Sequence, residues 1–191
     1  YITVTNNGGP ISASCSPATT TFCCGIGITN LQFGAINKSS GNASEGYQDF
    51  TCGNVTSLIA GDPVSLTVYT STTNFENVKA WIDYDNNGIF NTVTEQVFSS
   101  LNKKPSHFGI VYTHATAVLN TPLRLRVMDD NYMYSSFDPC SNLQNGQAED
   151  YTVIFHANTQ PPDVDFTSDV TVINVGGTIH FNDLSVNVPT S

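Results

Sequence analysis

The sequence predicts an all-β fold, an antiparallel β-sandwich of the jelly-roll or immunoglobulin-like kind. Charged residues make up only 12% of the 191 residues, while Thr, Ser, Asn and Gly are plentiful, a balance that favours strands and turns. Apolar and polar residues alternate in several short segments, as expected for strands with one buried face. Turn-rich stretches separate these segments, and no segment shows a sustained helical period with caps.

Each alternating segment is predicted to be a half-buried strand. In chain order these segments are Tyr1–Thr5, Val64–Val68, Val78–Ile82, Leu123–Val127 and Tyr151–Phe155. Turns are predicted at residues 6–10, 60–63 and 85–88, where Gly, Pro, Asn and Asp gather. Short strands joined by polar turns favour two packed sheets.

A polar stretch with two prolines marks a domain boundary near Asn158–Pro162. We therefore expect three parts. Residues 1–10 end a preceding module or linker, residues 11–157 form the sandwich, and residues 158–191 form a linker and the start of another module. This last part has two or three strand-like segments, too few to bury a core alone. We expect both ends to continue into neighbouring domains of the same polypeptide.

The charge balance excludes some partners. The formal net charge is −10, from 16 acidic residues against 6 Lys and Arg, and such a field repels phosphate backbones, so we expect no nucleic-acid partner. No apolar run approaches the roughly 20 residues that span a bilayer, so we expect no membrane insertion. Clustered carboxylates favour a divalent cation, and Ca²⁺ is the expected one.

Five cysteines lack the spacing of a zinc site and predict disulfides in a secreted or cell-surface protein. They are Cys15, Cys23, Cys24, Cys52 and Cys140. Several pairings remain open from sequence. Our expectation is that Cys15 pairs locally with Cys23 or Cys24, that Cys52 pairs with Cys140, and that one thiol is left over.

A calcium-binding loop is predicted at residues 83–89, where oxygen-bearing side chains alternate and a Gly follows. Ca²⁺ takes six to eight oxygen ligands, and a tight loop of this kind supplies them. The expected ligands are Asp83, Asp85, Asn87, the Ile89 carbonyl and a distal acid, Glu95. Asn91 and a carboxylate from another loop are alternative distal ligands. The alternative to a metal site is a hairpin turn capped by Asp and Asn.

Residues 129–138 concentrate aromatic and acidic side chains between two predicted strands, a pattern typical of a recognition loop. The expected ligand-binding residues are Asp130, Tyr132, Tyr134 and Phe137. Aromatic rings stack on the apolar faces of sugars, and carboxylates accept hydrogen bonds from sugar hydroxyls. The alternative is that these rings cover the edge of the core.

Two arginines and two acids are expected to pair across neighbouring strands. Arg124 and Arg126 project from one face of a predicted strand, and Glu149 and Asp150 enter another. Such pairs usually fix strand register and packing, so the predicted role of these residues is structural. The alternative is that Asp150 contributes to the calcium site.

The middle of the chain resembles the GEVED domain family of secreted bacterial proteins, common in Bacteroidetes. The resemblance rests on residues 47–51, 81–90, 123–127, 139–140 and 146–151, in family order over roughly residues 15–155. Gln147 and Ala148 depart from the motif that names the family. Residues 1–6 and 164–191 resemble pieces of PKD domains. The resemblance implies a module that stands beside extracellular peptidases and polysaccharide-degrading enzymes.

Catalytic motifs are not found. The four histidines lack metalloprotease spacing, and no nucleophile elbow occurs, so we do not expect an enzyme. The predicted function is a non-catalytic accessory module of a secreted multidomain protein, one that binds carbohydrate or targets a substrate and carries a structural calcium site. Its expected partner is a polysaccharide or cell-surface glycan. The alternative is a calcium-stiffened architectural or adhesive repeat of a large cell-surface protein.

Overall fold

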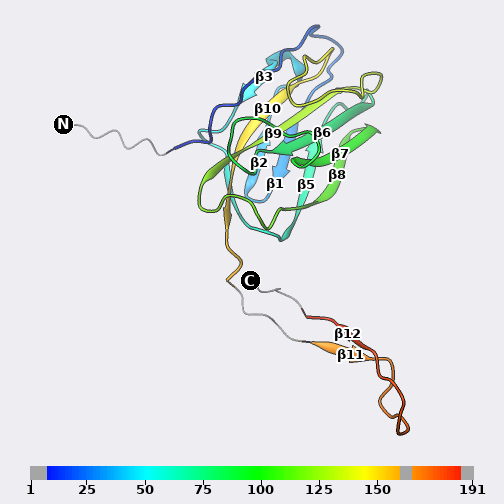
Figure 1. Cartoon of the computed structure of the whole chain (residues 1–191). Helices are drawn as coiled ribbons and strands as arrows, with labels where there is room; N and C mark the ends of the chain where they lie inside the picture. The colour runs from blue at the N-terminus through cyan, green and yellow to red at the C-terminus, as the bar shows by residue number, and fades with distance from the viewer. Residues whose placement is uncertain (1–7, 160–164, 186–191) are drawn as a thin grey trace, which may run out of the picture. The chain divides into compact units, whose positions relative to one another are not determined.

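The computed structural model describes residues 8–159 and 165–185 (Figure 1). The chain divides into two compact units, Tyr1–Ala157 and Asn158–Ser191. The predicted strand at Tyr1–Thr5, and with it most of the module expected over residues 1–10, lies outside the described residues. Among the described residues, no helix is long and apolar enough to cross a membrane.

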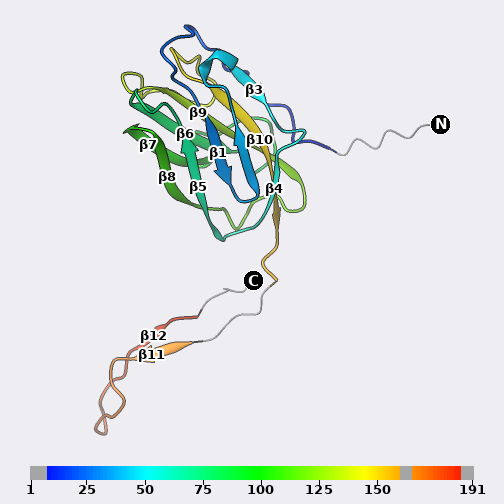
Figure 2. The ribbon, with the colours of Figure 1, turned by 180° about the vertical axis from the view of Figure 1, so that it is seen from behind.

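The first unit is a sandwich of two sheets, seen from opposite sides in Figures 1 and 2. The smaller sheet has the order β2-β1-β5-β8, with bounds β1 Asn30–Phe33, β2 Ile36–Ser39, β5 Pro63–Tyr69 and β8 Ser106–Tyr112. The larger sheet has the order β3-β10-β9-β6-β7, and β4 also pairs with β10. Its bounds are β3 Tyr47–Asp49, β4 Val55–Ile59, β6 Glu76–Ile82, β7 Gln96–Lys103, β9 Pro122–Asn131 and β10 Ala148–His156.

The all-β prediction is confirmed, with one difference in topology. Most neighbouring strands are antiparallel, but β3 and β4 both run parallel to β10. A single chain segment, residues 47–59, thus extends one edge of the larger sheet in two short steps. A short 3₁₀ helix, η1 (Ala43–Glu45), precedes it.

The main core lies between the two sheets, where the alternation predicted it. Val78, Ala80 and Ile82 of β6 point inward, as do Leu123, Leu125 and Val127 of β9 and Tyr151, Val153 and Phe155 of β10. They meet side chains of the smaller sheet such as Leu31, Leu66 and Val68. The four alternating segments predicted within the described residues are therefore strands.

The prediction that these strands are half-buried is wrong for β6, β9 and β10, which are buried on both faces. A second apolar cluster lies on the outer face of the larger sheet and includes Trp81, Met128 and Phe137. The segment before β1 covers it: Ser14 N–H donates to the Gly88 carbonyl, and residues 18–21 exchange backbone hydrogen bonds with residues 143–144. We call residues 11–21 the N-terminal strap.

The disulfide pairing predicted from sequence is wrong. Cys15 of the strap bonds to Cys140, Cys23 bonds to its neighbour Cys24, and Cys52 is an exposed free thiol. The reason is the path of the strap, which crosses the outer face of the larger sheet and brings Cys15 beside a residue 125 positions later. Spacing along the sequence does not report this crossing.

In the second unit, the described residues form one antiparallel strand pair, β11 (Phe166–Ser168) and β12 (Phe181–Asp183). The rings of Phe166 and Phe181 contact each other across the pair, with centroids 5.6 Å apart. None of the described residues 165–185 is buried. This part of the chain thus has no core of its own, as two strands predict.

Candidate functional sites

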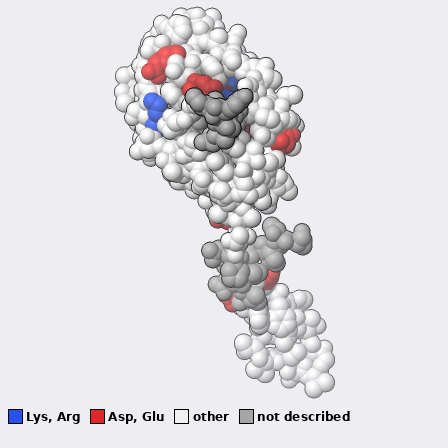
Figure 3. Space-filling model, turned by 90° about the vertical axis from the view of Figure 1, so that its left-hand side faces the viewer, with Lys and Arg blue, Asp and Glu red and all other residues white. Residues whose placement is uncertain are grey.

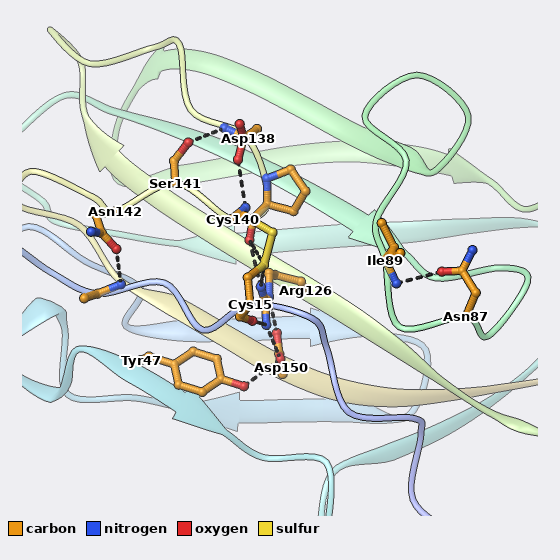
Figure 4. The surroundings of a disulfide bond; sticks show 12 residues. Cys15, Tyr47, Asn87, Ile89, Arg126, Asp138, Cys140, Ser141, Asn142 and Asp150 are labelled. Carbon is orange, nitrogen blue, oxygen red and sulfur yellow. Dashed lines mark hydrogen bonds and ion pairs between the residues drawn. A yellow bond between two sulfur atoms is a disulfide. The ribbon is translucent and has the colours of Figure 1, made fainter.

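The most extensive polar network lies on the outer face of the larger sheet and joins β9 to β10 (Figure 4). Arg126 donates from Nε and Nη2 to the two carboxylate oxygens of Asp150, both at 2.7 Å, which is bidentate geometry. Arg124 donates to the same carboxylate at 2.9 Å and to Asp49 at 3.2 Å. The Tyr47 hydroxyl donates to Asp150 at 2.8 Å. The Asp150 carboxylate thus has three partners, and two of them are the predicted arginines of the neighbouring strand. The same pairing predicted for Glu149 is wrong, because Glu149 bonds to Gln147 and Tyr151 and makes none of the ion pairs of the described residues.

The Arg126 guanidinium also holds the strap in place. Its Nη2 donates to the Cys15 carbonyl at 3.1 Å and its Nη1 to the Pro139 carbonyl at 2.7 Å. Both carbonyls lie next to the Cys15–Cys140 disulfide (Figure 4). The ring of Phe90 lies 5.0 Å from the guanidinium carbon on another side. A fully buried charge with this many partners serves structure, because it binds sheet, strap and loop together.

Ionisation in this network favours the charged pairs. Burial would raise the pKa of Asp49, but hydrogen bonds from Thr51 and the Arg124 guanidinium hold it below its ordinary value. Burial and the adjacent Asp150 carboxylate raise the pKa of the Tyr47 phenol, so Tyr47 remains a donor. The network is a neutralised structural site with no carboxylate left over for a metal ion.

The segment Gly146–Tyr151 is built into the sheet by contacts of the same structural kind. A Cβ at Gly146 would lie 1.8 Å from the Asp129 carbonyl oxygen, so only glycine fits there. The next residue, Gln147, donates from its backbone to the Asp129 carboxylate at 2.7 Å and from its side chain to Glu149 at 3.0 Å. Glu149 also accepts a hydrogen bond from the Tyr151 hydroxyl. Burial raises the pKa of Glu149 to about 7.

Three of the predicted calcium ligands converge after β6. Oxygens of Asp83, Asp85 and Glu95 lie within 4.8 Å of one another, and Asp83 and Glu95 are buried. The local fold places them: Asp83 accepts hydrogen bonds from the Asn87 and Gly88 amides, which closes the loop. Glu95 returns to this point because it accepts from the Tyr84 amide at 2.7 Å. We call these three side chains the acid cluster.

The electrostatics of the acid cluster suit a divalent cation. Burial raises the pKa of Asp83, with a further contribution from Asp85, and burial raises that of Glu95, with contributions from both aspartates. Among the described residues, all three ion pairs involve Arg124 or Arg126 and none includes the acid cluster. Hard carboxylate oxygens without a basic partner are the donor set that Ca²⁺ prefers. The residues present therefore fit the ion.

Two other predicted ligands are placed differently. The Asn87 side chain donates to Asp85 at 2.8 Å and accepts from the Ile89 amide at 2.7 Å, so its polar atoms bond within the loop. Ile89 is exposed. The alternative distal ligand, Asn91, accepts from the amides of Val93 and Thr94. Turn capping by Asp and Asn, the competing interpretation, thus occurs in the same loop as the acid cluster.

Beside the acid cluster lies a small pocket of about 150 Å³. Its lining includes Asp85, Glu95 and His114, whose ring stacks on Tyr84 with centroids 4.7 Å apart. The cluster is therefore reachable from solvent on one side. On the other side the strap packs on the loop, since a Cβ at Gly88 would lie 2.7 Å from the Ser12 carbonyl oxygen.

A larger pocket, of about 320 Å³, lies at the predicted recognition loop. We call it the loop pocket. Its lining is Asp130, Met133, Tyr134, Ser135, Ser136, Phe137, Ser141, Asn142 and Gln144. Three of the four predicted ligand-binding residues, Asp130, Tyr134 and Phe137, are thus in it. The fourth, Tyr132, is exposed but outside the lining.

The three residues have different positions in the loop pocket. Tyr134 is exposed, whereas Phe137 is buried with its ring against Trp81, 6.4 Å between centroids. Asp130 is also buried, and its carboxylate accepts hydrogen bonds from the amides of Asn131, Gln144 and Asn145. Asp130 therefore fixes the far wall of the pocket, while Tyr134 presents a ring to solvent.

One buried acidic pair was not anticipated from the sequence. Glu76 and Asp129 lie on neighbouring strands and are fully buried. Glu76 accepts hydrogen bonds from the amides of Gly27 and Ser71, and burial raises its pKa and raises that of Asp129 further. The sequence signal for this pair is weak: Glu76 lies two residues before the alternating segment Val78–Ile82, and Asp129 lies two residues after the segment Leu123–Val127.

The comparisons with known proteins agree with the central part of this description. The model of the GEVED domain family matches residues 77–154, from β6 to β10. The match includes the acid cluster, both arginines and the whole loop pocket. No curated protein matches the chain. The chain thus carries an all-β sandwich in which residues 77–154, from β6 to β10, are similar to a GEVED domain. The flanking PKD modules and the bacterial source remain predictions.

Proposed function

We propose that the first unit is a non-catalytic accessory module that recognises carbohydrate at the loop pocket and binds a structural Ca²⁺ at the acid cluster. The similarity to a GEVED domain supports an accessory module. Two disulfides support a secreted or cell-surface protein, because such bonds persist in oxidising compartments.

The observation that carries the proposal is the composition of the loop pocket. An exposed tyrosine and the neutral polar residues Ser135, Ser136, Asn142 and Gln144 line one concave surface. Asn142 and Gln144 each also make one side-chain hydrogen bond to the N-terminal strap. Sugars are held by this combination, a ring that packs on the apolar face and neutral polar groups that exchange hydrogen bonds with hydroxyls. The loop that forms the pocket wall is attached to β6, because Asn77 donates hydrogen bonds to the carbonyls of Asn131 and Tyr134.

A glycan and polysaccharide binding screen tests this proposal on the whole chain. We expect saturable binding to one class of glycan, and we expect Tyr134→Ala to weaken it about tenfold or more, since a ring contact on a sugar is a main part of such affinities. Val93→Ala is the matched control, because it removes an exposed apolar side chain from a different loop. A folded protein with no hits, or equal binding by both variants, would contradict recognition at the loop pocket.

An architectural or adhesive repeat is the second candidate function. It is favoured by the use of Phe137 and Asp130 in packing, which leaves one exposed ring, Tyr134, in the pocket lining. In that case calcium binding and stability persist while the glycan screen is negative. The two candidates therefore differ in the screen alone.

A further inference from the structure

The outer face of the smaller sheet carries large apolar side chains in a single row. Phe108, Ile110 and Tyr112 of β8 are 61%, 44% and 76% exposed. The residues between them face the core instead: His107 and Val111 are fully buried. Gly109 also points inward, where a Cβ would lie 2.7 Å from the ring of Phe98. The strand thus places its bulkiest side chains toward solvent, the reverse of ordinary amphipathic patterning.

The neighbouring strands surround this row with neutral polar groups. Thr67 of β5 lies opposite Phe108, and Ser65 lies opposite Ile110. Farther across the sheet, Gln32 pairs with both Thr67 and Asn37. The remaining outward positions of these four described strands are Asn30, Ser39, Pro63, Tyr69 and Ser106. We call the outward residues of β1, β2, β5 and β8 the sheet platform.

The sheet platform has no charged residue at any of its outward positions. Lys38 belongs to the opposite face, because it pairs with buried Leu31 and its ammonium lies over the ring of Phe50. The chain as a whole has a net charge of −10, and none of that charge is carried by the outward positions of these strands. Electrostatic complementarity favours a neutral partner at this face.

The shape of the apolar row indicates the kind of partner. Alternate residues on a strand are about 6.6 Å apart, so the rings of Phe108 and Tyr112 are separated by about 13 Å along the strand. On the neighbouring strand the row is bordered by the hydroxyl side chains of Ser65 and Thr67. Pro63 lies opposite Tyr112, and the exposed ring of Tyr69 lies at the other end of the row, opposite Ser106. A protein partner normally covers a broad apolar centre with a polar rim. A narrow ring row beside neutral hydrogen-bonding groups fits an extended chain of pyranose rings.

We propose that the sheet platform is a second carbohydrate-binding surface, which takes an extended neutral polysaccharide across Phe108, Ile110 and Tyr112. This inference rests on the proposed function, since it assumes that the module recognises carbohydrate. The loop pocket holds a compact glycan element, whereas the platform holds a stretch of polymer. Two sites of this kind raise retention on an insoluble polymer through effective concentration.

Binding to insoluble polysaccharides tests the platform. The full chain is mixed with cellulose powder, chitin powder and, as an anionic comparison, calcium alginate beads, and the fraction removed from solution is measured. We expect retention on a neutral polymer, weaker retention on alginate, and a loss of about tenfold or more in partition for Phe108→Leu/Tyr112→Leu. Leucine keeps the apolar character and removes the rings. Phe108→Tyr/Tyr112→Phe keeps both rings and should bind as the wild type does.

The possible outcomes separate the platform from the loop pocket. If Phe108→Leu/Tyr112→Leu loses retention while Tyr134→Ala binds as the wild type does, the platform is supported and the loop pocket is contradicted. If Tyr134→Ala loses retention while Phe108→Leu/Tyr112→Leu binds as the wild type does, the platform alone is contradicted. Absence of retention on every polymer overturns the platform, whereas the loop pocket stands or falls with the glycan screen. Equal retention by the leucine and ring-keeping variants overturns the platform as a ring-stacking surface. A concentration-dependent dimer that Phe108→Ala/Tyr112→Ala abolishes, measured by sedimentation, would assign the face to a second copy of the chain and overturn the proposal.

Discussion

Buried acidic side chains are a marked feature of the first unit, since Asp and Glu are seldom fully buried unless they are paired. Seven acidic residues are buried in the described part of the chain: Glu76, Asp83, Glu95, Asp129, Asp130, Glu149 and Asp150. Their burial is compensated in several different ways. Asp150 is paired with two arginines, Asp130 accepts three backbone hydrogen bonds, and Glu149 has a raised pKa. Asp83 and Glu95 meet at the acid cluster. Burial of an ionised carboxylate without an ion pair, hydrogen bonds or a raised pKa would be strongly unfavourable.

Glu149 predicts a measurable dependence of stability on pH. Burial raises its pKa from 4.5 in the unfolded chain to about 7. A raised acid pKa means that the stabilising contribution is present below pH 4.5 and is lost as the pH rises through about 7. The size of this loss is on the order of 3 kcal/mol. His107 acts in the opposite direction, because burial lowers its pKa to about 4, so its contribution is lost as the pH falls.

The variant Glu149→Gln isolates the first effect. We expect the free energy of unfolding of the wild type, relative to the variant, to decrease steadily from pH 4.5 to pH 7, because His107 and the other acids are common to both proteins and cancel. Urea unfolding at a series of pH values measures this difference. Parallel curves for the two proteins would mean that Glu149 titrates normally in the folded state.

At the scale of the residue, sequence reasoning found charged partners and missed the geometry of individual groups. The ion pair between Arg126 and Asp150 was predictable, because the alternation places both side chains on one face of neighbouring strands, where they lie opposite each other. The hydrogen bond from Asn87 to Asp85 within the loop was not predictable. The same residues at the same spacing are compatible with an Asn87 side chain that ligates a metal. The role of Asp130 as a support for loop residues 144–145 also depends on contacts outside its own segment.

The N-terminal strap is the element that decides how the larger sheet is covered. It has no regular secondary structure apart from the isolated bridge between Thr19 and Leu143, yet it buries the outer face of three strands and the arginine network. Its attachment is the Cys15–Cys140 disulfide together with the Arg126 hydrogen bonds. Nothing in the alternation of residues 8–27 indicates this role.

Removal of this disulfide should destabilise the sandwich. The bond closes a loop with a sequence separation of 125, and bonds that close long loops contribute about 2–5 kcal/mol. We expect Cys15→Ser/Cys140→Ser to lower the free energy of unfolding by an amount in this range. Urea unfolding under non-reducing conditions measures it.

Cys52→Ser is the matched control, because Cys52 is exposed and unpaired. This control should unfold like the wild type. If Cys52→Ser lowered the free energy of unfolding as much as the double variant does, the result would instead support the pairing of Cys52 with Cys140 that the sequence predicted. Peptide mapping would then detect that disulfide.

At the scale of the element, the alternation predicted some strands well and would assign others to the wrong face. In β5, β6, β9 and β10 the apolar residues point to the core, so the pattern and the structure agree. In β8 the same pattern has the opposite meaning, because His107 and Gly109 occupy the core side and the rings of Phe108 and Tyr112 face solvent. Periodicity identifies such a strand but does not determine which face points to the core. In β8 packing determines it, because the ring of Phe98 fills the space beside Gly109.

For the whole molecule, the negative charge is distributed rather than concentrated. In the face drawn in Figure 3, uncharged residues cover most of the described surface and the acidic groups form small separate patches. Many of the acidic residues are instead buried inside the first unit. Among the described residues, the acid cluster is the one group of three acids whose oxygens all lie within 4.8 Å of one another. Ca²⁺ at this cluster would hold the loop after β6 to Glu95 and, through Gly88, support the strap.

The most direct test of this account is thermal unfolding of the whole chain in Ca²⁺ and in chelator, for the wild type, for Asp85→Asn and for the control Asp62→Asn, an exposed acid outside the cluster. Ligand binding to the folded state stabilises it by about 2.7 kcal/mol at one hundred times the dissociation constant. We expect Ca²⁺ to raise the Tm of the wild type and of Asp62→Asn by the same amount and to raise that of Asp85→Asn far less. Equal shifts in all three proteins, or no shift in the wild type, would contradict a calcium site at Asp83, Asp85 and Glu95.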